Sequence, residues 1–187
     1  MTYSMKSALA ASLAVATLLA GGTAQAARPT DEAKAAYVQA KDAASASYKM
    51  GRVQCKTLAG NRKDLCVAEA KLNRIRTEQE AEAYYRNTLK AFTQARLRIA
   101  DAMYARDKTK CASVTGNDKD VCMSQAKSTR IATQADASAD KKAIEARNDA
   151  REDKRKAEYK VAIEKCDAFA GPIKDNCVSA AKAQFAH

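Results

Sequence analysis

The chain has 187 residues and a formal net charge of +11, with six Cys, six Gly, two Pro and no Trp. This length fits one domain or a short repeat array, and so few Pro and Gly are not typical of a β-sandwich or barrel. The one His is the terminal residue, His187, so we expect neither a Ser-His-Asp or Cys-His active site nor a multi-His zinc site.

The segment over 1–26 has the layout of a secretory signal peptide. Lys6 precedes an apolar run over 8–20, and 24–26 (Ala-Gln-Ala) form a small-x-small cleavage site. The apolar run is shorter than the stretch of about 20 residues that a helix needs to span a bilayer; an uncleaved anchor or a buried helix is the alternative. We predict a cleaved signal peptide over 1–26 and a periplasmic mature chain over 27–187 without a stable membrane span, secretion being the alternative.

The six Cys lie in three copies of one pattern, C-x2-apolar-x-G-x2-K-D-x-C, over 55–66, 111–122 and 166–177. The spacing between successive copies is nearly constant, each copy is followed by Ala-Lys, and a Tyr stands seven positions before each first Cys. Agreement at this many positions identifies an internal repeat. We therefore predict a single helical repeat domain whose three corners lie near these segments.

Each copy predicts a helix, a tight turn and a second helix that runs back. Ala- and Lys-rich sequence without Pro favours the helix, and the Gly suits the left-handed residue at its C-terminus. The Asn after the Gly suits an N-cap with Asp three residues further on, and in the third copy Gly caps a helix that begins with Pro. The predicted turn and cap residues are Gly60, Asn61, Asp64, Gly116, Asn117, Asp120, Gly171, Pro172 and Asp175.

The same symmetry predicts how the cysteines pair. In an antiparallel helix pair, positions equidistant from the turn lie side by side, and both Cys of each copy are five residues from its central Gly-Asn or Gly-Pro pair. Six Cys allow 15 pairings, and an exported chain is expected to be oxidised. Reduced thiols that bind metal or do redox work are the alternative, but such sites usually have C-x2-C spacing. The predicted disulfides are Cys55–Cys66, Cys111–Cys122 and Cys166–Cys177.

Between the corners the chain runs over 66–111 and 122–166 without internal Gly or Pro, which predicts long Ala-rich helices. Asn87-Thr88 and 138–140 (Ser-Ala-Asp) are candidate breaks, because such residues start helices better than they continue them. The mature chain has four helices without these breaks and about six with them, and we favour the unbroken helices. The predicted fold is all-α: three disulfide-stapled helical hairpins joined by long Ala-rich helices, in a slender bundle or coiled-coil-like rod without a ligand cavity.

The Cys unit carries a family resemblance. The pattern C-x2-L/V/F-x-G-x2-K-D-x-C-x3-A-K, set in Ala-, Lys- and Glu-rich helix behind a signal peptide, resembles a group of small exported bacterial proteins. These are often labelled Tol-like cell-envelope biogenesis proteins, because their composition is similar to that of a long helical linker in the Tol system. The resemblance covers about residues 30–185 and departs from the pattern at Pro172 and Asn176. It implies a role in the cell envelope and supplies no catalytic residue.

The basic charge suggests what the protein contacts. Cleavage removes only Lys6, which leaves 32 Lys and Arg against 22 Asp and Glu, a net charge of +10. Outside the cytoplasm the available polyanions are lipopolysaccharide, anionic lipid and peptidoglycan, so we expect a non-enzymatic scaffold that contacts anionic envelope components or protein partners. Since acids are interleaved, a merely solvated face is the alternative for each cluster. The candidate contact residues are Arg74, Arg76, Arg96, Arg98, Arg151, Lys154, Arg155 and Lys156.

Two other functions stay open. One is a periplasmic stress chaperone or adaptor that holds unfolded clients on amphipathic faces. The other is metal or haem handling through reduced Cys, although Met50, Met103 and Met123 form no cluster in the sequence. We expect no enzyme, no bound metal and no cofactor, and export argues against nucleic acid as the native partner despite the charge. The sequence does not determine the oligomeric state.

Overall fold

The computed structural model describes residues 30–185, so the predicted signal peptide over 1–26 and His187 lie outside the described residues. Within 30–185 all regular structure is helical and there is no strand, which confirms the predicted all-α fold. The five helices are α1 (Asp31–Cys55), α2 (Gly60–Arg86), α3 (Leu89–Cys111), α4 (Gly116–Cys166) and α5 (Gly171–Phe185).

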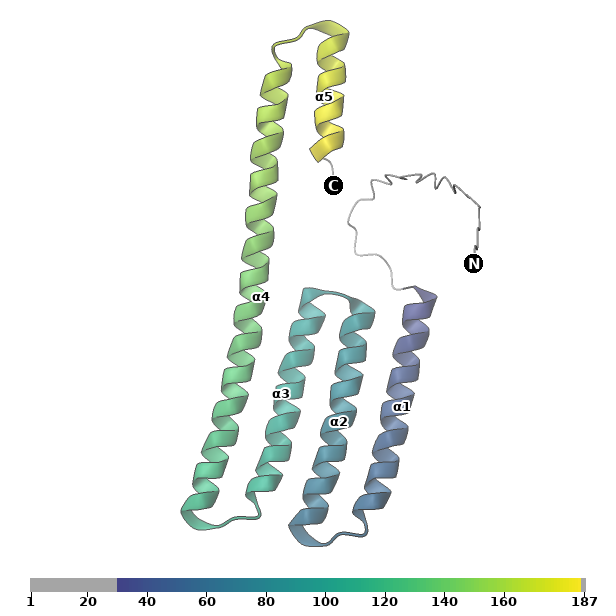
Figure 1. The fold of residues 1–187 in the computed structure, drawn as a ribbon, viewed down its shortest axis with the longest axis vertical. Coiled ribbons are helices and arrows are strands. Elements are labelled where there is room, and N and C mark those ends of the chain that lie inside the picture. The colour runs from purple at the N-terminus through teal and green to yellow at the C-terminus, as the bar shows by residue number, and fades with distance from the viewer. Residues whose placement is uncertain (1–29, 186–187) are drawn as a thin grey trace, which may run out of the picture.

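The helices form a single layer. Figure 1 shows α1, α2, α3 and the first half of α4 side by side, with the second half of α4 and α5 extending beyond the layer. Each described helix packs only against the helix before it and the helix after it in the chain. Neither face of the layer is therefore covered by another described helix, and none of these helices combines the length and apolar character needed to cross a bilayer.

The three predicted disulfides are confirmed. Cys55–Cys66, Cys111–Cys122 and Cys166–Cys177 have Cα–Cα distances of 5.7, 5.6 and 5.6 Å, which lie within the range that a disulfide requires. The first cysteine of each pair is the last residue of a helix and is at most 1% exposed. Each bridge therefore ties a helix to the helix that returns from it, directly at the turn.

The backbone follows the same course at all three corners. After the last helical residue, three successive N–H groups donate to carbonyl oxygens three residues earlier, at 3.1 to 3.4 Å, which tightens the helix end into a 3₁₀ turn. At the first corner an extended residue follows, Ala59 with φ −129°, and then Gly60 with φ +56°. Gly116 and Gly171 have φ values of +58° and +57°. The repeated glycine thus takes up a left-handed conformation, which it adopts without the strain that a Cβ would bring.

The predicted N-caps at Asn61 and Asn117 are wrong, and so are the capping-box roles of Asp64 and Asp120. Helices α2 and α4 begin at the glycine, so their N-cap residues are Ala59 and Thr115, two residues before each Asn, and neither makes a side-chain capping bond. Because the left-handed glycine is the first residue of each helix, both Asn lie in the first helical turn instead of the cap position. In the third copy, Pro172 lies in the first turn of α5, where its missing N–H is tolerated.

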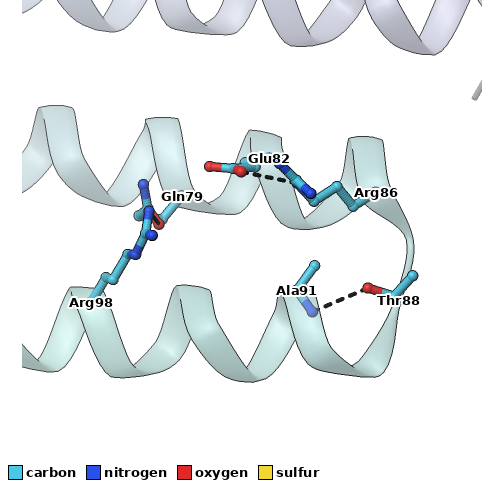
Figure 2. A network of polar contacts seen from close by, with 6 residues as sticks. All are labelled: Gln79, Glu82, Arg86, Thr88, Ala91 and Arg98. Atoms are coloured by element: carbon cyan, nitrogen blue, oxygen red, sulfur yellow. Dashed lines mark hydrogen bonds and ion pairs between the residues drawn. The ribbon is translucent and has the colours of Figure 1, made fainter.

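The two long Ala-rich segments differ. The first breaks at the predicted candidate: Asn87 is left-handed, with φ 45° and ψ 45°, and the Thr88 hydroxyl caps α3 by accepting from the N–H of Ala91 at 3.1 Å. Figure 2 shows this cap. The second segment stays helical through 138–140, and α4 is unbroken over 51 residues. The expectation of an unbroken helix therefore holds for 122–166 and is wrong for 66–111.

The core between the helices is built from small side chains. Leu72 is the one large aliphatic residue classed as buried within 30–185. The other buried apolar residues, besides three cysteines, are Ala44, Ala83, Ala91, Ala95, Ala100, Ala126, Ala137 and Ala181. Alanine removes little apolar surface from water, so each helix pair gains little from packing. The covalent corners consequently supply a large share of the stability.

Candidate polyanion-contact surface

Positive charge is uneven along the helices. Helix α3 has six Lys and Arg against two Asp, whereas α4 has twelve against ten Asp and Glu. The acids of α4 therefore nearly balance its cations. A polyanion that responds to net charge is drawn to α3 and the adjoining corners more strongly than to α4.

Two of the predicted contact residues, both on α3, link this helix to its neighbours. Arg96 forms an ion pair with Asp140 of α4 at 2.6 Å. On the other side, Nη1 of Arg98 donates to Oε1 of Gln79 of α2 at 3.2 Å, and Figure 2 shows the two side chains facing each other across the helix pair. These two guanidinium groups therefore have a structural role in the layer before any ligand is considered.

The two predicted contact residues of α2 lie differently. Arg74 pairs with Glu78 at 2.8 Å, and its guanidinium carbon lies 5.3 Å from the ring centre of Tyr48. Arg76 is exposed. Of this pair, only Arg76 points its charge at solvent without an ion pair to another residue in 30–185, so the predicted cluster does not act as a unit.

Every member of the predicted cluster in the second half of α4 has a partner within the chain. The contacts are Lys154–Glu158 at 3.8 Å, Lys156–Glu152 at 2.7 Å, Arg155 to the carbonyl oxygen of Phe185 at 2.5 Å, and Arg151–Asn148. A hydrogen bond and the charge of Glu152 raise the pKa of Lys156 above its ordinary value of 10.5. The two Lys–Glu pairs are exposed and lie four residues apart on one helix, so they compensate charge locally without holding the helix rigid.

The first two corners are joined to each other by Asn61. With its amide group oriented to satisfy both partners, Asn61 donates to the carbonyl oxygen of Thr109 at 2.8 Å and accepts from the N–H of Ser113 at 3.3 Å. Figure 1 shows both turns at the same end of the layer. The side chain that the sequence placed at a helix cap therefore sets the two corners side by side.

Exposed basic residues gather where these corners meet, and none of them forms an ion pair with another residue of the described range. We call this group the corner edge: Lys56, Arg62, Lys63, Lys108, Lys110 and Lys119. Three exposed acids, Asp64, Asp118 and Asp120, lie at the same edge. The corner edge thus keeps an excess of positive charge that the protein itself does not neutralise.

Sequence reasoning missed the corner edge because it looked for basic residues that are neighbours in the chain. The members of the edge come from two copies of the repeat, and only the fold back at Asn87 and Thr88 brings these copies together. One indication was present in the sequence. The Lys of the repeated pattern occurs as Lys63 and Lys119, and equivalent residues of two adjacent hairpins are expected at the same end of a layer.

An apolar groove lies between α2 and α3. Its volume is about 630 Å³, and its apolar lining comes from Val67, Leu72, Ile75, Ala102 and Ala105. The groove stays open because the small side chains of α3 leave space beside the larger ones of α2 and no described helix covers the pair. The described fold has no second layer to close a cavity, but it has this open groove, which the sequence did not predict.

No group of three or more His, Cys, Asp or Glu side chains within 30–185 is placed to hold a metal ion. All six Cys are in disulfides, so no observation favours metal or haem handling through reduced Cys. Comparison of the chain with family models, with curated proteins and with solved structures gave no match. The functional interpretation consequently rests on the residues and geometry of this chain.

Proposed function

We propose that this protein is a non-enzymatic periplasmic scaffold of the cell envelope that contacts anionic envelope components through its corner edge. The observation that carries the proposal is the corner edge itself, six exposed Lys and Arg that lack ion pairs in the described part of the chain. Three disulfides suit a chain that folds in an oxidising compartment. The resemblance of the Cys repeat to exported envelope proteins supports the location.

The expected mode of contact is electrostatic. An exposed Lys or Arg beside an anionic surface contributes about 1 kcal/mol, and the three acids at the edge offset part of this attraction. The result is weak, reversible association, in which flexible ammonium groups meet phosphate or carboxylate groups without a fixed geometry. Such attraction is screened by salt, because the Debye length falls from about 10 Å at 0.1 M to about 3 Å at 1 M ionic strength.

Removing charge from the corner edge should weaken binding to anionic surfaces. The variant with Lys63→Gln and Lys119→Gln loses two contacts of about 1 kcal/mol each, so we expect roughly 30-fold weaker binding to phosphatidylglycerol vesicles in dilute buffer. Co-sedimentation with the vesicles measures this binding. Parallel measurements with isolated peptidoglycan and with lipopolysaccharide identify which polyanion is preferred.

The matched control removes the same charge from α4. Lys154→Gln with Lys156→Gln should change vesicle binding by less than about 3-fold, because the acids of α4 already compensate these lysines. Wild-type binding should disappear as salt is raised towards 1 M. Binding that survives high salt, or that both double variants weaken equally, would contradict a role for the corner edge.

The groove between α2 and α3 favours a second candidate function, that of a periplasmic chaperone or adaptor. Its apolar lining could hold segments of unfolded clients. In that case near-stoichiometric protein should suppress aggregation of a heat-unfolded client, and Ile75→Asp should abolish the suppression while Val53→Asp on exposed α1 leaves it intact. Light scattering of the client measures the effect, and circular dichroism verifies that both variants stay helical. Equal loss in both variants, or no suppression by the wild type, would reject this function.

A further inference from the structure

The three hairpins are copies of one packing unit. In each, the repeated Tyr of the first helix lies against an equivalent residue of the returning helix. The pairs are Tyr48 with Arg74 and Tyr104 with Arg130, both at 5.3 Å from guanidinium carbon to ring centre, and Tyr159 with Phe185, whose ring centres are 5.9 Å apart. Helices α1 and α2, α3 and the first half of α4, and the second half of α4 and α5 are therefore equivalent pairs.

The contact between successive units is formed only once within the described chain. Units one and two pack through α2 and α3, because the chain reverses at Asn87 and Thr88. Units two and three share the unbroken α4, so its two halves, which are equivalent to α2 and α3, follow each other along one helix (Figure 1). The interface between α2 and α3 has no counterpart between units two and three.

The residues of α4 that are equivalent to the contact residues of α2 and α3 lie on the surface of α4. The step from Cys55 to Cys111 relates α2 to the first half of α4, and the step from Cys111 to Cys166 relates α3 to the second half. Five of the apolar residues that line the contact between α2 and α3 keep their identity in α4, where all five are exposed. The five equivalent pairs are Ile75 and Ile131, Ala83 and Ala139, Ala91 and Ala146, Ala95 and Ala150, and Ala102 and Ala157. Four others differ in α4, where Val67, Ala68, Leu72 and Ala105 correspond to Met123, Ser124, Ser128 and Lys160.

These exposed residues form one continuous face. Ala139 and Ala150 are separated by about three helical turns, and so are Ala146 and Ala157. Ile131 in the same face is 55% exposed. Leu72 of the α2 groove corresponds to Ser128, so this face is more polar than its counterpart between α2 and α3 and suits a partner that is bound reversibly.

We propose that a second copy of this chain covers the face, with the two α4 helices antiparallel about a two-fold axis near residue 144. The first half of each α4 then packs on the second half of the other, in the register that α2 and α3 adopt. Within one chain α4 cannot make this contact while it is unbroken, whereas two antiparallel copies make it twice. The corner edges of the two copies lie at opposite ends of the pair.

Charge complementarity supports this register. Arg86 and Gln94 line the same depression between α2 and α3, and their equivalents in α4 are Lys142 and Asp149. In the antiparallel pair, Lys142 and Asp149 of the second copy therefore border the same depression, about one helical turn from directly opposite each other, and two-fold symmetry repeats the contact. Neither residue forms an ion pair with another residue of 30–185. Seven positions apart on one helix, they are too far apart to pair within the chain.

The test measures mass in solution and exchanges the charges. Sedimentation equilibrium of the disulfide-bonded protein should show a dimer. Lys142→Glu or Asp149→Lys alone should raise the dissociation constant of this dimer about 10-fold or more, because each change places like charges together at two contacts. The double variant should recover wild-type affinity to within about 3-fold. Recovery in the double variant distinguishes a specific contact from a general effect of charge.

A second variant tests the origin of the face. Replacing Ala143 by the dipeptide Asn-Thr reproduces the break that separates α2 from α3, so α4 should fold back on its own face and the protein should become a compact monomer. If the wild-type protein is a monomer at concentrations of tens of micromolar, the proposal is overturned, whether that monomer has an extended or a compact shape. A dimer that neither charge reversal weakens also overturns it.

Discussion

Loss of each disulfide should lower the free energy of unfolding by roughly 3 kcal/mol, because each bridge closes a loop of about 12 residues in the unfolded chain. The effect is large relative to the rest of the fold. Leu72 is the one buried large aliphatic residue in 30–185, and the remaining apolar core is mostly alanine. Chemical denaturation followed by circular dichroism, with and without reductant, measures the loss.

The position of the bridge should decide how the loss is distributed. With Cys166→Ala and Cys177→Ala, only α5 should fray, because α5 packs only against α4. With Cys111→Ala and Cys122→Ala, the contact between α3 and α4 should weaken as well, and the whole layer should melt at lower denaturant. Hydrogen exchange resolves the two patterns. Equal destabilisation throughout the chain in both variants would contradict the nearest-neighbour character of the layer.

The corners could be predicted from the sequence because the same physical requirement occurs in all three of them. A glycine with φ near +57° and two cysteines, each five residues from the central Gly-Asn or Gly-Pro pair, fix the turn and the bridge together. What could not be predicted is a property of contacts between units. Asn61 is a good N-cap residue by type, but its amide reaches the next corner at Thr109 and Ser113 instead, which no local pattern reveals.

The two candidate breaks in the long helices show the same limit. Ser138 and Asp140 tolerate the helix interior because their side chains find partners there. The Ser138 hydroxyl donates to the carbonyl oxygen of Gln134 at 2.9 Å, and Asp140 pairs with Arg96 at 2.6 Å. Asn87 takes the left-handed conformation, and the hydroxyl next to it caps the following helix. Residue type alone marks all of these positions as possible breaks, and only the available partners separate them.

Replacing Asn87 and Thr88 by Ala should destabilise the protein by about 2 kcal/mol without straightening the hairpin. Alanine in the left-handed conformation costs about 1 kcal/mol, and loss of the Thr88 cap costs about 1 kcal/mol more. Against this, separating α2 from α3 would expose Leu72 and several buried alanines, of which Ala83 is 2% exposed. At roughly 25 cal/mol per Å², each 100 Å² of apolar surface that is exposed costs about 2.5 kcal/mol, so packing should keep the chain folded back.

Two measurements separate these contributions. The midpoint of chemical denaturation reports the stability, and small-angle scattering reports whether α2 and α3 have merged into one long helix. Ser138→Ala is the matched control, since α4 is already continuous there, and it should change stability by less than about 0.5 kcal/mol. If the Asn87 and Thr88 variant instead becomes extended, the local stop signal and not the packing between units holds the layer together. The same experiment would then imply that α4 is straight only because it lacks such a stop.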